Sequence, residues 1–213
     1  MTPKQAARRA RIEQAAYEVL SEAGYNSASL LTIAKRASAS NETLYKWYGS
    51  KQALFRSLVE ANASQARSIL EKALGDGSDP LKALAKLGPA LLALVTGERA
   101  VTLNRAAAGD ISDTGTLGKA IGEAGRDMIA PLLRDLLDRA RQKDLIDCDD
   151  PADAAEIYFH LLIGDLQIRR VIGTIGELSQ QEIERRSRRA FGLFCRLYAP
   201  ATGKIGRRGQ RLP

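Results

Sequence analysis

The chain has 213 residues and a formal net charge of +7, and 45% of its residues are hydrophobic although only 5% are aromatic. Ala and Leu make up most of the hydrophobic fraction, which favours helices over sheets, and two cysteines are too few for a disulfide framework. The composition therefore predicts an all-α protein. The chain has no apolar run long enough to cross a membrane and no apolar secretory signal at its start, so we also expect it to be cytoplasmic, with no membrane partner.

Positive charge is concentrated at both ends of the chain. Residues 1–51 carry eight basic and four acidic side chains, and residues 200–213 add four basic ones. The remaining 148 residues are close to neutral, with 20 basic and 21 acidic side chains. A basic module joined to a neutral body indicates a polyanionic partner at one end, and a basic surface that serves only solubility fits the composition equally well.

Apolar residues three and four apart predict four helices in the first third of the chain. Gly24 and Gly49 are expected to end the first and third helices, and Ser29 and Ser50 to cap the second and fourth. The predicted ranges are Pro3 or Lys4 to Ala23, Leu30 to Ala37, Asn41 to Tyr48, and Lys51 towards Leu74.

A breaker-rich segment at residues 75–80 separates these helices from a second helical part. Pro131 is expected to kink one helix there, and Ser179 with Glu182 forms a capping box for the last one. The predicted ranges are Leu81–Val95, Glu98–Ala108, Leu117–Lys143, Pro151–Ile172 and Ser179–Tyr198. We expect a DNA-binding domain at 1–50, a ligand-binding and dimerisation domain at 51–199, and a basic, disordered tail at 200–213.

Two short helices joined by a short link, over residues 30–48, are typical of a helix-turn-helix. Leu44 and Tyr48 can face the protein interior, which leaves a polar face for the major groove. Hydroxyls, lysines and helix N-termini supply the phosphate contacts that such a motif needs. The predicted DNA-binding residues are Ser29, Ser40, Asn41, Thr43, Tyr45, Lys46, Trp47 and Lys51.

Residues 10–60 resemble the N-terminal domain of TetR-type transcriptional regulators. The resemblance is carried by a Gly-aromatic pair, an I-A-x-x-A core, a T-L-Y-x-x-aromatic stretch and a polar-Lys-x-x-L helix start. These are Gly24-Tyr25, Ile33 to Ala37, Thr43 to Tyr48, and Ser50 to Leu54. The resemblance implies an N-terminal three-helix DNA-binding domain, followed by a helical bundle that dimerises and can enclose a ligand pocket.

The resemblance also implies roles for matching residues. Tyr45, Thr43 and Lys51 would contact phosphates, while Lys46 would read guanine and Asn41 adenine. Trp47 would pack on a thymine methyl or the sugar backbone, or else be partly buried against the first helix. The basic residues of the first helix would add phosphate or minor-groove contacts, unless this terminus is frayed and solvated. They are Lys4, Arg8, Arg9 and Arg11.

Three positions depart from the family pattern. Ser38 and Ala39 stand where the family turn usually has Gly and a branched apolar residue, and Ser tolerates a positive φ poorly, so we expect strain there. Glu42 stands where small residues are common. We expect Glu42 to pair with Lys46 four residues on, in preference to accepting a hydrogen bond from cytosine.

The resemblance further implies a cavity among the middle helices. Apolar side chains there could line it, although an ordinary core role fits each of them better. The single histidine is expected to be a core or interface residue, and with no second histidine or cysteine pair we expect no metal and no cofactor. The predicted lining is Leu87, Leu91, Leu94, Val95, Leu103, Met128, Leu132 and Leu136, with Asn104, Arg105, Tyr158 and His160 as polar points.

The last two predicted helices carry more apolar surface than one face requires, which favours a homodimer built as a four-helix seam. Gly164 and Gly173 could allow close approach at that seam. A two-fold dimer would match a palindromic operator on double-stranded DNA. The predicted interface residues are Leu162, Leu166, Ile168, Phe191, Phe194 and Tyr198.

The sequence suggests three alternative functions. The first is a dimeric repressor that a small hydrophobic effector releases from DNA, and the second is a ligand-independent regulator controlled by a protein partner or by its own concentration. The third, a helical enzyme, is disfavoured because the chain has no Ser-His-Asp set and no Gly-rich phosphate loop.

Overall fold

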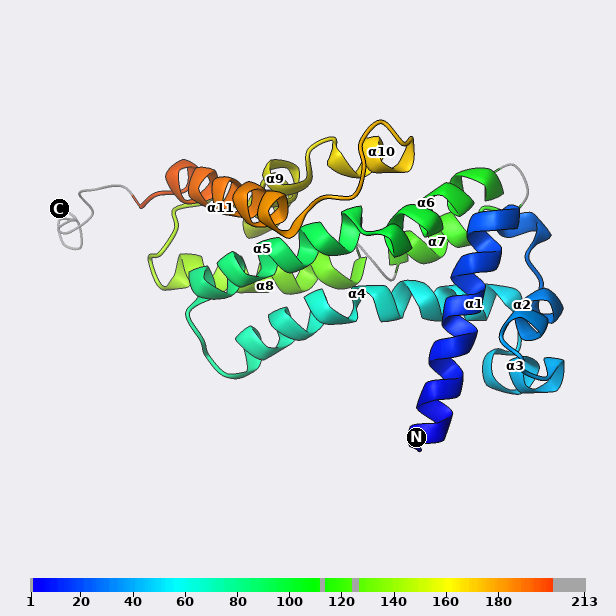
Figure 1. Ribbon diagram of the computed structural model, residues 1–213. Coiled ribbons are helices and arrows are strands. Elements are labelled where there is room, and N and C mark those ends of the chain that lie inside the picture. The colour runs from blue at the N-terminus through cyan, green and yellow to red at the C-terminus, as the bar shows by residue number, and fades with distance from the viewer. Residues whose placement is uncertain (1, 112–113, 124–126, 201–213) are drawn as a thin grey trace, which may run out of the picture.

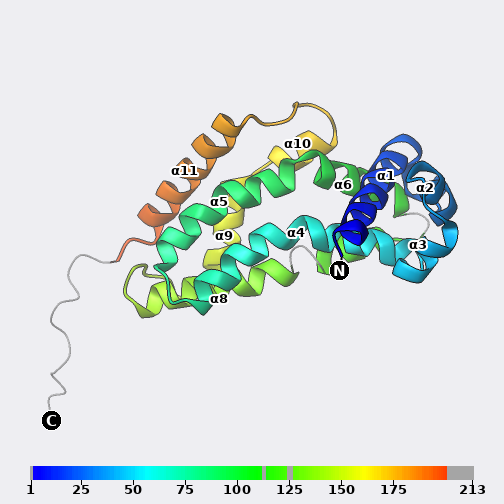
Figure 2. The same cartoon turned by 60° about the horizontal axis from the view of Figure 1, so that its bottom comes forward.

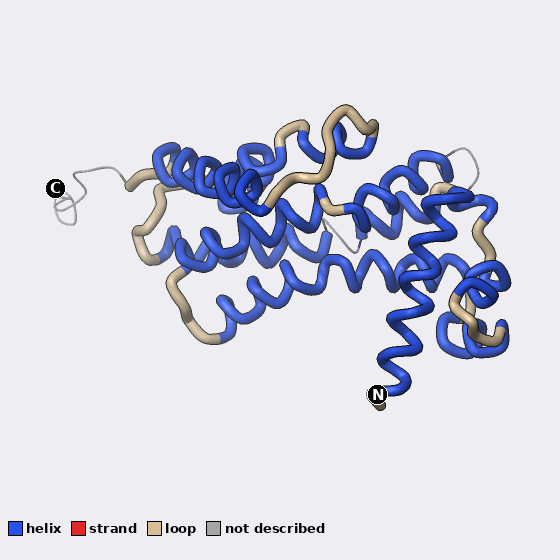
Figure 3. The backbone as a smooth tube through the Cα atoms, in the orientation of Figure 1, coloured by secondary structure: helices blue, strands red, loops and turns tan. Residues whose placement is uncertain are grey.

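The structure, a computed structural model, describes residues 2–111, 114–123 and 127–200. These residues form α-helices and short connections with no strand, as Figure 3 shows. The all-α prediction is therefore confirmed. The tail expected to be disordered lies, from residue 201 on, outside the described residues.

The four N-terminal helices lie where the sequence placed them. Ser29, Ser40 and Ser50 each cap a helix by accepting a hydrogen bond from the backbone N–H three residues on. Gly24 has φ +71° and ψ 174°, so it breaks the helical path before a final turn. The helices are α1 (Pro3–Ser27), α2 (Leu30–Arg36), α3 (Asn41–Tyr48) and α4 (Lys51–Gly75).

Seven further helices follow in the described residues. They are α5 (Pro80–Thr96), α6 (Glu98–Asp110), α7 (Thr116–Ile121), α8 (Asp127–Gln142), α9 (Pro151–Ile163), α10 (Leu166–Val171) and α11 (Gln180–Leu197). The capping box of Ser179 and Glu182 at the start of α11 is confirmed.

The two long predicted helices differ from the described structure. The stretch expected at Leu117–Lys143 contains α7 and α8, with residues 124–126 between them outside the described residues, and Pro131 lies near the start of α8. The stretch expected at Pro151–Ile172 ends at Gly164, whose φ of +53° and ψ of −128° are incompatible with a continuing helix. Apolar periodicity on both sides of Gly164 hid this break, because the pattern does not record the backbone angle of a single glycine.

The buried side chains form two clusters. The head core lies among α1, α2, α3, the first half of α4, and parts of α6 and α7. The body core lies among the second half of α4 and helices α5, α8, α9 and α11. Figures 1 and 2 show α4 running from the head at one end of the molecule into the body. One helix therefore joins both cores, which ties the position of the head to the body.

Helix α6 makes a second connection between head and body by packing against α1. The Arg99 guanidinium lies over the Tyr17 ring at 5.4 Å from its centroid, and the Tyr17 hydroxyl donates to the Leu58 carbonyl at 3.4 Å. Burial raises the pKa of Tyr17 to about 12.

No single described helix is long and apolar enough to cross a bilayer; α5 and α6 meet that length and composition test only when taken together, and they are bent by 48° from each other.

Candidate nucleic-acid interface and internal cavity

Helix α3 is anchored on one side and exposed on the other. Leu44 is fully buried in the head core, and Tyr48 packs against that core half-buried. The side chains between them face outward: Tyr45 is 55% and Trp47 36% exposed, and Lys46 is exposed as well. A short helix with this division can enter a groove without losing its attachment to the domain.

The turn before α3 contains the strain that the sequence indicated. Ser38 has φ +49°, in the left-handed region that favours glycine. The turn is closed by backbone hydrogen bonds from Ala39 N–H to the Ala34 carbonyl (2.9 Å) and from Ser38 N–H to the Lys35 carbonyl (3.3 Å). The turn geometry of a helix-turn-helix is therefore made without the usual glycine.

Six of the eight predicted DNA-binding residues lie together at the start and on the exposed face of α3. Ser40 and Thr43 are joined by a hydroxyl contact of 2.7 Å. Asn41 is half-buried, and its Oδ1 is buried with no hydrogen-bond partner, so this atom does not face a groove. The six residues are Ser40, Asn41, Thr43, Tyr45, Lys46 and Trp47.

The other two lie at neighbouring helix starts. Ser29 is exposed, and its hydroxyl is engaged with Thr32 in a capping box of α2. Lys51 is partly buried: its Nζ donates to the Tyr25 carbonyl at 3.0 Å and lies 4.2 Å from the centroid of the Tyr25 ring. Lys51 therefore stabilises the end of α1, and a phosphate would have to share its ammonium group.

The predicted Glu42–Lys46 pair is wrong, because no ion pair joins these side chains in the described part of the chain. Arg36 does form one: its guanidinium contacts Glu22 at 2.6 Å and Glu18 at 3.5 Å, so part of the basic charge of α2 is neutralised by α1.

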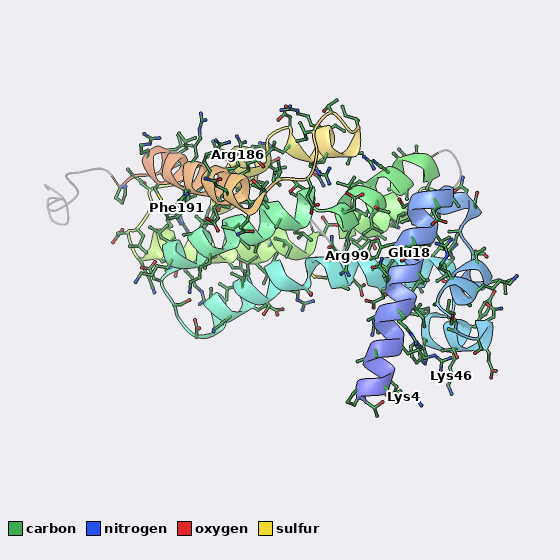
Figure 4. All side chains as sticks on the ribbon, in the orientation of Figure 1. Lys4, Glu18, Lys46, Arg99, Arg186 and Phe191 are labelled. Carbon is green, nitrogen blue, oxygen red and sulfur yellow. The ribbon has the colours of Figure 1, made fainter. Side chains whose placement is uncertain are left out.

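The basic end of α1 is helical from Pro3 and is not frayed, since Thr2 and Gln5 form a capping box. Arg8 Nη2 donates to Thr43 Oγ1 at 3.0 Å, and the Arg8 guanidinium carbon lies 5.8 Å from the Trp47 ring centroid. Sequence reasoning grouped Arg8 with the other basic residues of α1 and missed this contact. Figure 4 shows Lys4 and Lys46 on the same side of the molecule, which brings the end of α1 beside the exposed face of α3.

A cavity of about 430 Å³ lies among α4, α5, α6, α8 and α9 and is also lined by Ile121 of α7 and Gln167 of α10. Its lining is mainly apolar, and its polar side chains are those of Asn62, Asn104, Glu156, His160 and Gln167. Of the predicted lining residues, the cavity includes Leu91, Leu94, Val95, Leu103, Asn104 and His160. The sequence did not predict that residues of α4, including Val59 and Ala63, line the cavity, because the apolar pattern does not show which helices pack against that side of α4.

Six predicted lining residues do not border the cavity. Arg105 donates to the backbone carbonyls of Val171 and Arg170 at 2.7 and 3.1 Å. The Tyr158 hydroxyl donates to the Leu84 carbonyl at 3.1 Å, and burial raises the pKa of Tyr158 well above its usual range. The other four are Met128, which contacts Arg67, and Leu87, Leu132 and Leu136, which pack in or against the body core.

His160 does not belong to the core. Its side chain is 73% exposed at the edge of the cavity, with Nε2 3.9 Å from a Glu156 oxygen. Of the two expected roles, core or interface, the core role is wrong because the sequence did not show which side of α9 faces outward; the interface role stays a prediction.

Two predicted interface residues are also wrong. Leu162 and Phe194 are fully buried within one chain, where the Phe194 ring lies edge-on to Tyr158 at 5.4 Å between centroids, so neither can reach a second copy. Leu166, Phe191 and Tyr198 pack half-buried against the body core, while Ile168 is 56% exposed. Gly164 faces Arg186 of the same chain: a Cβ there would lie 2.9 Å from Arg186 Nη2.

Comparison with known proteins gives matches in both parts of the chain. A family model described as "Bacterial regulatory proteins, tetR family" matches residues 12–58, and one described as "AefR-like transcriptional repressor, C-terminal domain" matches residues 82–200. The uncharacterized HTH-type transcriptional regulator YvkB of Bacillus subtilis (strain 168) is 35% identical over 66 residues. That alignment covers 31% of this chain and 35% of YvkB, so the chain matches about a third of that relative.

Solved structures match over nearly the whole length. A protein from Mesorhizobium loti assigned to the TetR family of transcriptional regulators is 26% identical, with a TM-score of 0.73, over 92% of this chain and 99% of that chain. The flavonoid-responsive regulator FrrA is also 26% identical, with a TM-score of 0.66 and the same shares of the two chains.

Proposed function

The chain belongs to the TetR family of bacterial regulatory proteins and is a DNA-binding transcriptional regulator, not an enzyme; from this premise we propose that it is a cytoplasmic homodimeric repressor, released from a palindromic operator by a small hydrophobic effector. The observation that carries the DNA-binding part is the division of α3, with Leu44 buried and Tyr45, Lys46 and Trp47 presented outward. A regulator controlled by a protein partner or by its concentration is the second candidate.

In the proposed complex, α3 lies in the major groove and its neighbours hold the phosphates. Lys46 and Trp47 face base edges, while the hydroxyls of Thr43 and Tyr45 contact the backbone together with Ser29, Ser40 and Lys51. The Oδ1 atom of Asn41 is buried, so Asn41 contributes to base recognition through its side-chain nitrogen Nδ2.

Replacing Lys46 tests the placement of α3. A Lys46→Ala variant should lose about 1–3 kcal/mol of discrimination at one base pair, because a lysine that reads guanine is removed. The measurement is selection of bound duplexes from random DNA, followed by affinity titrations on the recovered and scrambled duplexes. Lys143→Ala, in the turn directly after α8, is the matched control. Unchanged preference in Lys46→Ala would place α3 outside the groove.

The effector proposal is supported by the cavity and by the helix that lines it. Ala100, Leu103 and Asn104 of α6 border the cavity, and Leu103 also belongs to the head core against α1. A ligand that displaces α6 would therefore act on the head directly. A thermal-shift screen of hydrophobic compounds tests this. The comparison variant is Leu94→Trp, because an indole ring is larger than the leucine side chain and should fill the cavity. Compounds that stabilise the wild type and not the variant support an effector, and no stabilising compound favours the second candidate.

The dimer proposal is supported by large apolar side chains exposed near the end of the described chain. They are Ile168, Ile172 and Leu197. Light scattering should give twice the 23.1 kDa chain mass, and Leu197→Glu combined with Ile168→Glu should shift the equilibrium towards the single chain because two charges would be buried. A wild type of single-chain mass at micromolar concentration would contradict the dimer.

A further inference from the structure

We propose that Arg8 is a positioning residue of the DNA-binding surface, which holds the Thr43 and Trp47 side chains of α3 in place and thereby determines sequence preference. Arg8 belongs to the second turn of α1, and it contacts two residues that are one helical turn apart on α3. The contacts join segments 35 or more residues apart in the chain. The inference extends DNA binding by this regulator and does not depend on an effector or on a dimer.

Helix α3 needs such a support because its attachment to the core is small. It has eight residues, and Leu44 is its only buried one. Trp47 lies on the exposed side of α3, where it is 36% exposed and does not belong to the head core. A guanidinium over an indole ring is attracted by the π-electrons, and this attraction favours one ring orientation over the others.

Thr43 is fixed from two sides. Its hydroxyl accepts a hydrogen bond from Arg8 Nη2 at 3.0 Å and lies 2.7 Å from the Ser40 hydroxyl, which itself accepts from Thr43 N–H at 3.2 Å. Arg8, Thr43 and Ser40 thus form a chain of polar contacts across the start of α3. Because Arg8 donates to Thr43 Oγ1, the hydroxyl proton of Thr43 is directed away from Arg8, towards Ser40 or a DNA phosphate.

The side chain must be an arginine for this arrangement. A planar guanidinium can stack on Trp47 and donate sideways to Thr43 at the same time, whereas an ammonium group is a point charge with no stacking face. The support of Arg8 itself is firm, because the capping box of Thr2 and the Arg9–Glu13 ion pair at 2.9 Å stabilise this part of α1.

The test compares Arg8→Lys with Arg188→Lys. Both changes keep the charge, and Arg188 is exposed on α11, which belongs to the body and not to the DNA-binding head. On the duplex selected by the wild type and a scrambled duplex, Arg8→Lys should reduce the affinity ratio on the order of tenfold, from the lost hydrogen bond and ring contact. The salt dependence of binding should stay the same, because the number of neutralised phosphates is unchanged. Arg188→Lys should alter neither quantity.

A second readout needs no DNA. Trp47 is the only tryptophan in the chain, so fluorescence excited where tyrosine does not absorb reports on the surroundings of Trp47. Arg8→Lys should lower the fluorescence anisotropy of Trp47 and shift its emission, while circular dichroism stays that of the wild type. Identical fluorescence in wild type and Arg8→Lys would overturn the proposal. A second pair of results would also overturn it: Arg8→Lys keeps the wild-type affinity ratio, and Arg8→Met weakens binding to both duplexes equally. Arg8 would then act only as a phosphate contact.

Discussion

Ser38 illustrates how single residues decide the geometry of the DNA-binding head. Its φ of +49° is required by the turn that sets α3 against α2. A side chain at such an angle is strained, because its Cβ approaches the neighbouring backbone carbonyl. The departure from the family pattern at this position therefore has an energetic consequence, and the turn forms in spite of it because Leu44 and the backbone hydrogen bonds of Ala39 impose it.

Ser38→Gly should raise the free energy of unfolding by up to about 1 kcal/mol, since glycine reaches this φ without strain. The gain is limited because glycine also loses more freedom on folding. Urea denaturation followed by circular dichroism measures it, and Ser38→Ala serves as the control that keeps the Cβ and the strain. A lower stability for Ser38→Gly would show that the turn is relaxed with serine.

At the scale of elements, the junction between α6 and α7 depends on one buried carboxylate. Asp110 is fully buried at the end of α6, and it accepts hydrogen bonds from the Thr114 hydroxyl at 2.8 Å and from Leu117 N–H at 3.1 Å. Burial alone would raise the pKa of the Asp110 carboxyl, but the hydrogen bonds from Leu117 and Thr114 outweigh it and hold this pKa below its usual range. The carboxylate thus fixes the start of α7 to the end of α6.

Asp110→Asn should lower the free energy of unfolding at pH 7 by about 1–3 kcal/mol, because the amide cannot accept the same set of hydrogen bonds. The folded-state pKa of Asp110 is depressed, so its contribution is present above the unfolded pKa of about 3.9 and is lost as the pH falls below it. The variant should therefore lose less stability than the wild type between pH 5 and the acid range. Urea midpoints across this range measure both effects, with the exposed Asp135→Asn as control; parallel pH profiles for wild type and Asp110→Asn would contradict the assignment.

At the scale of the whole molecule, the cavity and the DNA-binding surface share structural elements. The first half of helix α4 belongs to the head core and its second half to the body core. Helix α6 lines the cavity on one side and packs on α1 on the other. Coupling between two sites requires an element whose position both sites affect. The contact of Arg99 with Tyr17 lies at that element, on the side of the head.

Arg99→Ala should leave binding of a cavity ligand within about twofold of wild type, since Arg99 does not line the cavity. It should reduce the effect of that ligand on DNA affinity by about 0.5–1 kcal/mol, the range of a cation–π contact at a partly exposed site. Titrating DNA affinity with and without the ligand measures the coupling, and Arg134→Ala on α8 is the control. Equal coupling in wild type and Arg99→Ala would show that this contact does not transmit the effect of the ligand to the head.

The sequence alone determined the helix-turn-helix, the caps at Ser29 and Ser50, the strained position of Ser38 and the all-α class, because caps, turns and amphipathic periods are recorded in residues a few positions apart. The break at Gly164 was not predicted, since the apolar periodicity continues across it. Only the tertiary structure decided that Leu162 and Phe194 are internal, that His160 is exposed, that α4 borders the cavity, and that Arg8 reaches Thr43. These facts depend on how helices far apart in the chain are rotated and packed against one another, and a periodic pattern shows that a helix has an apolar side without showing which neighbour covers it.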